Sequence, residues 1–559
     1  MSEPSSSPED GQPRTGTTVE SPSIVRSSAI MAAGSLASRI LGLIRNTLTI
    51  AVVGLNLIPS DAWNAANTLP NIFHLLIAGG VLNAVIVPQI TKALRHEDGG
   101  TVYINRLLTL SVTVLAAVTL VLTLAAPLLV SLVVSSSWDS SSRGLATAFA
   151  VLCLPQVFFY GLYTLLGQVL TAHNRFGMFM WAPALANVVA IAGLLWFLIT
   201  DTQLKAPVSQ WTPTMIWVLA GTATASIAVQ ALVLIPSLRA TGLRFRPVWG
   251  IRGSGLGSAS KMAVWAFAAV AVGQLGYFVN SRVLTDATYR AAEAGIEGAG
   301  LTAYANAYLL FMLPHGLVTV SLVTALFTRL SHAAHDGDVG AVTSDLRRGM
   351  TMPAVLLIPT TAVVVLLAPF VLAAILPGSD RAATDASVGV LVTMILGLVP
   401  YGWFFLVQRA YYAYEDGRTP FALQLLVTLI AVSVTLIGST QPAQQVAAWV
   451  GTGQSLSNLA AALVGLWLLR RRLGPLGLGA VARQNSSLLL ATGVATLLGW
   501  LALRGLDGPL QGDTWIGAVL LCIIIGGIVL AITLLVAAGL RVREVTEVLG
   551  PLTRRLSRG

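Results

Sequence analysis

Charged residues are scarce in this chain. Lysine, arginine, aspartate and glutamate together make up 10% of its 559 residues, whereas hydrophobic residues make up 55%. A soluble globular domain carries about 25% charged residues, so this chain could not cover a water-exposed surface of its size. The composition excludes a single soluble enzyme, a disordered protein and a secreted disulfide scaffold. It leaves a polytopic helical membrane protein.

Cysteines and catalytic signatures are also scarce. The two cysteines, Cys153 and Cys522, lie inside apolar runs without CxxC spacing or a nearby histidine cluster. We therefore expect packing residues and neither a disulfide nor a metal site. The sequence has no HExxH motif, no P-loop and no paired carboxylates within its apolar segments. We expect no enzyme activity and no cofactor.

Long apolar runs, in contrast, are abundant. A helix needs about 20 such residues to cross the hydrocarbon core of a membrane, and about fourteen segments reach that length. Because the alternating ten-residue strands of a barrel are missing, we predict an all-α polytopic membrane protein. The predicted spans are residues 28–56, 62–94, 107–134, 145–172, 178–200, 212–237, 258–284, 301–329, 350–376, 387–413, 420–438, 444–469, 484–503 and 514–540.

The net charge of +10 is unevenly distributed along the chain. If both termini are cytoplasmic, as an even number of spans requires, most of the 33 lysines and arginines fall in cytoplasmic segments. This bias follows the positive-inside rule. It places the positive charge against the anionic lipids of the inner leaflet, so nucleic acid is not needed as a partner. Only six fall in external loops: Arg143, Lys205, Arg282, Arg290, Arg381 and Arg504.

The basic connections also suggest how the chain is divided. The longest of them separates the first twelve spans into two sets of six that both start in the cytoplasm, so any repeat would be parallel. The Ser/Pro-rich start of the chain is predicted to be disordered. The predicted parts are a cytoplasmic tail (1–26), an N-lobe (27–238), a basic linker (239–257), a C-lobe (258–470), helices thirteen and fourteen (484–540) and a basic cytoplasmic tail (541–559).

Two arginines lie within the first predicted span. Arg39 is about 17 Å into the span, near the midplane, and Arg45 is about 26 Å in. A charge near the bilayer midplane costs about 2.5–3.5 kcal/mol on insertion scales, so it must face protein or a water-filled cavity. The only acid near these helices is Asp61. An anionic ligand, above all a phosphate, suits two such arginines better than a structural ion pair does.

Three further residues are candidates beside these arginines. Asp61 lies at the external start of the second span, where it could be a helix cap or a gate contact with Arg45. His74 lies near the midplane, at the depth of Arg39, and could donate to phosphate, titrate, or simply pack. His315 follows Pro314 near mid-depth of the eighth span, where a packing role competes with a substrate contact.

Short motifs in a fixed order add a resemblance. They are Ser38-Arg39-Ile40-Leu41-Gly42-Leu43-Ile44-Arg45, Asp61-Ala62, Leu69-Pro70-Asn71, Ala78-Gly79-Gly80 through Val87-Pro88, and Arg409 with Tyr412-Ala413, Asp416 and Arg418-Thr419-Pro420. Together they resemble the MurJ (MviN) family of lipid II flippases, within the multidrug/oligosaccharidyl-lipid/polysaccharide exporter superfamily. The resemblance covers essentially residues 27–540.

The resemblance implies two six-helix lobes around a central cationic cavity, with a groove for the polyprenyl tail beside the last two helices. Ser38, Arg39, Arg45, Asp61 and Asn71 match positions that the family uses in its cavity or gate. The chain departs from the family where many members have acids or an arginine: Asn46, His74 and Gly79 stand there instead. This variant pattern is similar to that of actinobacterial members.

The resemblance implies a function in the bacterial cytoplasmic membrane, namely flipping of lipid II to the outer leaflet by alternating access. Arg39 and Arg45 would capture the pyrophosphate with help from His74. The expected partners are lipid II, anionic membrane lipids and the cell-wall synthesis machinery. Two alternatives stay open. One is transport of another polyprenyl-linked glycan, or of a drug by cation antiport, and the other is a membrane scaffold without transport.

Overall fold

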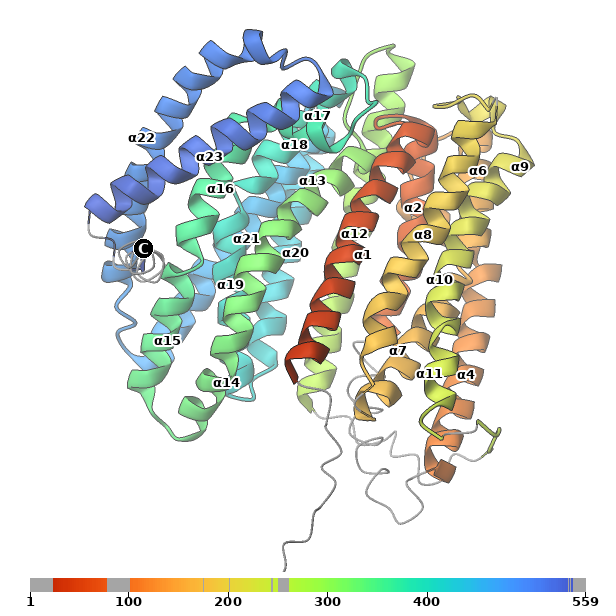
Figure 1. The fold of residues 1–559 in the computed structure, drawn as a ribbon, viewed down its shortest axis with the longest axis horizontal. Helices are drawn as coiled ribbons and strands as arrows, with labels where there is room; N and C mark the ends of the chain where they lie inside the picture. Colours follow the sequence, from red (N-terminus) through yellow and green to blue (C-terminus); the bar gives the residue numbers. More distant parts are fainter. Residues whose placement is uncertain are drawn as a thin grey trace, which may run out of the picture.

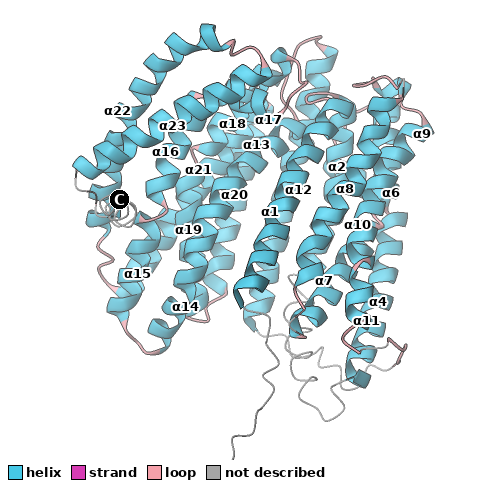
Figure 2. Cartoon of the chain, in the orientation of Figure 1, coloured by secondary structure: helices cyan, strands magenta, loops and turns pink. Residues whose placement is uncertain are grey.

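The computed structural model describes residues 24–77, 101–173, 175–200, 202–242, 245–249, 261–540, 542, 544 and 545. Every regular element within these ranges is a helix, and none is a strand (Figure 2). The two predicted tails lie almost entirely outside the described residues, as do the predicted linker from residue 250 on and the motif that includes Gly79 and Pro88.

The first half of the chain forms a bundle that we call the N-terminal bundle. In it α1 packs on α8, α8 on α10, α2 on α6, and α7 on both α4 and α10 (Figure 1). Its elements are α1 (Ile24–Val53), α2 (Ile58–Ile77), α4 (Thr101–Leu124), α5 (Ala126–Val133), α6 (Ser140–Cys153), α7 (Gln156–Ala172), α8 (Gly177–Ile199), the 3-10 turn η2 (Val208–Gln210), α9 (Pro213–Ile216), the π-helical turn η3 (Trp217–Gly221), α10 (Thr222–Leu232) and α11 (Leu234–Arg239).

The second half forms the C-terminal bundle, in which α21 packs against α18, α19 and α20, and α12 packs against α20. Its elements are α12 (Lys261–Glu293), α13 (Leu301–Pro314), the π-helical turn η4 (His315–Val320), α14 (Ser321–His335), α15 (Val339–Thr351), α16 (Ala354–Leu366), α17 (Ala368–Ile375), α18 (Arg381–Ile395), α19 (Leu398–Ala413), α20 (Arg418–Ser439) and α21 (Ala443–Leu473). The last two helices, α22 (Leu478–Leu510) and α23 (Trp515–Gly539), pack on each other and on α16.

Each predicted span coincides with helical structure, as far as the described residues reach. Within the part of the chain that the structure describes, eleven helices are long and apolar enough to cross a membrane, and the pair α18–α19, bent by 41°, would make twelve. The two remaining predicted spans coincide with α2 and α21. The described part of α2 ends at Ile77, so only the first half of its predicted span can be seen. The all-helical membrane fold predicted from the sequence is confirmed.

The two bundles touch mainly at one end of the molecule. Helix α2 packs on α12 and α13, and α5 packs on α12. One side-chain hydrogen bond between the bundles, between Tyr277 of α12 and Thr68 of α2, lies deeper in the molecule. The other hydrogen bonds that join the bundles among the described residues involve residues near the ends that the charge bias places outside. Examples are Asn56 Nδ2 to the Ala383 carbonyl (2.8 Å) and Thr47 Oγ1 to the Ile375 carbonyl (2.9 Å). The contacts between the two bundles are therefore one-sided: they gather at the end of the molecule that the charge bias places outside.

Candidate functional site

A small polar cavity lies among α1, α2, α7, α8 and α10, with the start of α13 beside it. Its volume is about 150 Å³. We call it the arginine cavity, because Arg45 is the one charged side chain among the described residues that line it. Its polar lining residues are Arg45, Asn46, Thr49, Asn64, Asn67, Gln156, Tyr160, Thr222, Ser226 and Thr302.

Arg45 lies in this cavity beside Tyr160, with no hydrogen-bonded or ion-paired partner among the described residues. Within the described part of the chain its guanidinium makes no hydrogen bond and no ion pair, whereas its backbone carbonyl accepts a bond from Thr49 Oγ1 at 2.8 Å. The neighbouring Asn46 donates from Nδ2 to Asn306 Oδ1 of α13 at 2.7 Å, which ties α1 to the other bundle. A guanidinium in a half-buried polar cavity with no carboxylate beside it is suited to an anionic ligand.

His74 approaches the same cavity through an aromatic contact. Its ring stacks on that of Tyr160, with the centroids 5.2 Å apart and the planes 29° from parallel. Tyr160 in turn lines the arginine cavity with Arg45. His74 Nδ1 is buried and has no hydrogen-bond partner among the described residues. The imidazole of His74, which can donate or accept a hydrogen bond, is thus held next to the arginine cavity, and Tyr160 links it to the cavity that contains Arg45.

Arg39 and Ser38 lie elsewhere on α1. Arg39 is exposed, lines neither of the two cavities described here, and has no partner among the described residues. Helix α1 runs unbroken past Gly42, and Arg45 lines the arginine cavity whereas Arg39 does not. Ser38 contributes its backbone carbonyl, which accepts a hydrogen bond from Asn187 Nδ2 of α8 at 3.0 Å.

Asp61 holds the two bundles together. Helix α2 begins at Ile58, so Asp61 lies in its first turn and not at its N-cap, and the predicted contact with Arg45 is not formed. Its fully buried carboxylate instead caps α13 of the other bundle: it accepts bonds from the Leu301 and Thr302 amides at 3.1 and 2.8 Å. The hydroxyls of Thr302 and Thr288 add bonds of 2.8 and 2.6 Å.

The geometry of this cap depends on a glycine. A Cβ at Gly300, directly before α13, would collide with Thr288 Oγ1 and with Asp61 Oδ2. The carboxylate can therefore approach the first turn of α13 only because Gly300 has no side chain. A negative charge at a helix N-terminus also interacts favourably with the helix dipole. We call Asp61 with Thr288, Leu301 and Thr302 the Asp61 cap.

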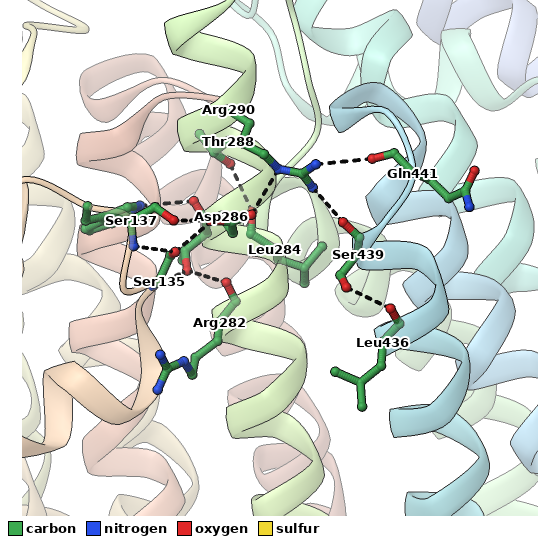
Figure 3. A network of polar contacts seen from close by, with 12 residues as sticks. Ser135, Ser137, Arg282, Leu284, Asp286, Thr288, Arg290, Leu436, Ser439 and Gln441 are labelled. Atoms are coloured by element: carbon green, nitrogen blue, oxygen red, sulfur yellow. Dashed lines mark hydrogen bonds and ion pairs between the residues drawn. The ribbon is translucent and has the colours of Figure 1, made fainter.

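A second polar network joins the bundles at the rim of the same end (Figure 3). Asp286 of α12 accepts hydrogen bonds from Ser135 and Ser137 Oγ, each at 2.8 Å, and pairs with Arg290 Nε at 2.9 Å. Arg290 also donates to the carbonyls of Ser439 and Gln441, both at 3.2 Å. This rim network connects the α5–α6 loop of the N-terminal bundle to the α20–α21 loop of the C-terminal bundle.

Asn71 faces a second cavity, of about 420 Å³, which lies between α2 and the helices α12, α13, α19, α20 and α21. None of the described residues that line it is charged or a histidine. We call it the amide cavity after its carboxamide side chains. Its polar lining residues are Thr68, Asn71, Gln274, Tyr277, Asn280, Tyr304, Tyr308, Tyr401, Gln424, Thr428, Gln454 and Asn458.

His315 is packed inside the C-terminal bundle. It begins the π-helical turn η4, is 1% exposed, and contacts Tyr401 and Phe405 with ring centroids 4.4 and 5.4 Å away. Its Nδ1 has no partner among the described residues. It lines neither cavity itself, and Tyr401 stands between it and the amide cavity.

Sequence reasoning missed most of the neutral lining residues. On α2 a signal was present, because Asn64, Asn67, Asn71 and His74 recur at helical spacing and form one polar stripe. In the C-terminal bundle, Gln424 with Thr428 and Gln454 with Asn458 each repeat four residues apart inside apolar spans. Tyr160 gave no such signal, because a single tyrosine in an apolar run is common packing.

The chain is similar to known proteins over most of its length. Residues 52–507 match the family model described as lipid II flippase MurJ. A lipid II flippase MurJ of Burkholderia cenocepacia is 27% identical over 418 residues, which cover 72% of this chain and 77% of that protein. A probable lipid II flippase MurJ of Synechocystis is 24% identical over 491 residues, covering 86% of this chain and 87% of that one.

Solved structures show the same fold. One described as lipid II flippase MurJ in an inward closed conformation has a TM-score of 0.68 and 17% identity, covering 90% of this chain and 98% of that chain. A multidrug resistance MATE family transporter of the MOP superfamily, in an inward-facing conformation, has a TM-score of 0.62 and 15% identity, covering 80% and 99%. Because the family model matches most of its residues, this multi-pass membrane protein belongs to the MurJ family of lipid II flippases, a family of transporters rather than enzymes.

Proposed function

We propose that this protein moves lipid II from the inner to the outer leaflet of the bacterial cytoplasmic membrane. The observation that carries the proposal is the unpartnered guanidinium of Arg45 in a half-buried polar cavity. The pyrophosphate of lipid II would supply the missing negative charge. The guanidinium fork donates parallel hydrogen bonds to phosphate oxygens and stays charged at every physiological pH.

The roles of the other candidates follow from their positions. His74, stacked on Tyr160, is placed to assist Arg45 at the pyrophosphate. Arg39 and Ser38 would meet the substrate earlier on its path, because they precede Arg45 by almost two helical turns. Asn71 would contact it in the amide cavity. Asp61 would act as a gate residue through its hydrogen bonds to α13 of the C-terminal bundle. His315 would support the wall of the amide cavity through its contact with Tyr401.

Transport would proceed by alternating access between two lobes, residues 27–238 and 258–470. The one-sided contacts between the bundles support this division, because they close the end that the charge bias places outside. Both termini would be cytoplasmic. The basic cytoplasmic segments would lie against anionic lipids, and the cell-wall synthesis machinery would receive the product.

The neutral and cationic lining argues against a drug exporter driven by cation antiport. Among the residues that the structure describes, no aspartate or glutamate lines either cavity. A cationic drug or a coupling cation would need a carboxylate to replace its hydration. A pyrophosphate-linked glycan needs the opposite charge, which Arg45 provides.

Reconstituted transport tests the proposal. The purified protein in liposomes should expose labelled lipid II in the opposite leaflet, and Arg45→Ala should abolish this because the phosphate contact is lost. Arg45→Lys should retain part of the activity, since an ammonium keeps the charge and loses the planar fork. Arg381→Ala, an exposed arginine at the start of α18, is the matched control and should transport normally.

Two results would overturn the proposal. One is normal transport by Arg45→Ala at wild-type protein levels. The other is transport of a different polyprenyl-linked glycan with no transport of lipid II. Depletion in cells provides an independent measurement: lipid II should accumulate in the inner leaflet when the protein is withdrawn.

A further inference from the structure

The amide cavity has chemistry that the arginine cavity lacks. It is nearly three times larger, at about 420 against 150 Å³, which is within the range of small-molecule sites. The described part of its wall has no charged side chain and so offers nothing to neutralise a phosphate. Instead it presents carboxamides, which both donate and accept hydrogen bonds, and the rings of several tyrosines.

Most carboxamides of this cavity are not used by the fold; the exception among the described residues is Asn280, whose Oδ1 accepts a hydrogen bond from Thr435 Oγ1 at 2.9 Å. Gln274, Gln424 and Gln454 make no side-chain hydrogen bond with any described residue. Asn458 of α21 is the sharpest case, because it is 1% exposed and neither its Nδ2 nor its Oδ1 has a partner among the described residues. A buried amide without partners costs about 1–3 kcal/mol. A side chain retained at that cost points to a partner that the protein chain does not supply.

Tyrosine rings form another part of the lining of the amide cavity. The rings of Tyr304 and Tyr308 lie 13° from parallel with centroids 6.4 Å apart, and Tyr308 is exposed. The face of an aromatic ring carries partial negative charge, which attracts the C–H bonds on the flat side of a pyranose ring. Amides around aromatic faces therefore suit a ligand with hydroxyl groups, neutral amides and C–H faces.

We propose that the amide cavity binds the uncharged N-acetylated saccharide of the lipid-linked substrate, while Arg45 binds its pyrophosphate. This inference rests on the proposed function and names the part of the substrate that each bundle holds. The stem peptide fits this cavity less well because it carries carboxylates, and no cation in the lining would balance them.

The relative position of the two cavities suits one molecule that bridges them. Along α2, residues 63–67 line the arginine cavity and residues 68–75 line the amide cavity. On α13 the two neighbouring residues of the Asp61 cap divide in the same way: Thr302 lines the first cavity and Leu301 the second. A pyrophosphate and the sugar attached to it would thus lie on either side of the contact that holds the bundles together.

Binding to two lipids separates this inference from the proposed function. We would measure the affinity of purified full-length protein for lipid II and for undecaprenyl pyrophosphate, which lacks the saccharide. Asn458→Leu and Gln454→Leu should each weaken lipid II binding about tenfold, the effect of one lost hydrogen bond of about 1.4 kcal/mol, and leave undecaprenyl pyrophosphate binding unchanged. Gln445→Leu, an exposed amide on the same helix, is the matched control.

Thermal stability distinguishes a ligand contact from a packing role. Because both amide atoms of Asn458 lack partners, Asn458→Leu should keep or raise the melting temperature of the ligand-free protein. The inference is overturned if the two variants lose affinity for both lipids equally, if they lose none, or if the wild type binds the two lipids equally well. If the wild type binds neither lipid, the proposed function itself fails.

Discussion

Each bundle holds a histidine against a tyrosine, and the two pairs differ in what surrounds them. In the N-terminal bundle, half-buried His74 stacks on Tyr160 at 5.2 Å, beside the cavity that contains Arg45. In the C-terminal bundle, fully buried His315 contacts Tyr401 at 4.4 Å, behind a cavity without charge. A tyrosine separates each histidine from the nearest cavity, so the two pairs differ in their burial and in the charge of that cavity. We predict that these two properties, rather than the tyrosine contact, decide whether the histidine acts on a ligand.

The two polar networks that join the bundles, the Asp61 cap and the rim network, also differ in their burial. The Asp61 cap is buried and its carboxylate accepts four hydrogen bonds, whereas the Asp286–Arg290 pair of the rim network is partly exposed, with side chains 27% and 35% accessible. Exposed pairs contribute little because water already satisfies them. The buried cap should therefore dominate the closed state.

Removing the Asp61 carboxylate should have the largest effect. Asp61→Ala leaves the first amides of α13 and two buried hydroxyls without an acceptor, which should cost about 3–4 kcal/mol. We expect a lower melting temperature, and a cysteine placed at Asn64 in the arginine cavity should become reactive from outside. Gly300→Ala should produce the same labelling with the carboxylate intact, because its Cβ would displace Asp61. Protection of the cysteine in both variants would contradict the gate role.

Replacing each histidine with an arginine should have different effects in the two histidine–tyrosine pairs. His315→Arg should cost about 2.5–3.5 kcal/mol and misfold, because the guanidinium would be buried among Tyr401 and Phe405. His74→Arg should fold and transport, because the arginine cavity is next to it. Detergent-extracted yield and lipid II transport measure the difference. If both variants fold equally well, the distinction between the two histidines is lost.

Breaking the rim network should have the smallest effect. Arg290→Ala removes one exposed ion pair and two bonds to carbonyls, and we expect a loss of about 1 kcal/mol and only slightly faster external labelling of the same cysteine. Thermal unfolding alongside Asp61→Ala provides the comparison. An effect as large as that of Asp61→Ala would show that the rim, rather than the buried cap, closes the outer end.

The sequence predicted the helices well because hydrophobic length is a local property. Residues 514–540 have no charge at all, and the structure places α23 there. It predicted Arg45 in a polar cavity for a similar reason, since a charge within a span must be accommodated somewhere. The short external loop around Asp61 likewise showed that a carboxylate stood near the end of a helix.

Long-range pairing could not be predicted. Asp61 and its α13 partners are about 240 residues apart, so nothing near Asp61 indicates which helix it caps. The different surroundings of Arg39 and Arg45 also depend on long-range pairing. The sequence gives the angle between the two side chains on α1, but the helices that cover or expose each face of α1 are α8 and α13. The neutral amides of the amide cavity could not be recognised by charge, which is the property that marks a candidate residue inside an apolar span.

The position of the contacts between the bundles also bears on the timing of the proposed alternating access. Three donors of the Asp61 cap belong to Leu301 and Thr302 in the first turn of α13, and the fourth, Thr288 Oγ1, belongs to α12 of the same bundle, so outward movement of this bundle would have to break all four bonds. Outward opening would then be an activated step, and we expect its frequency rather than the arrival of substrate to limit turnover. A ligand accelerates the cycle only by the amount that it binds the opened arrangement more tightly than the closed one.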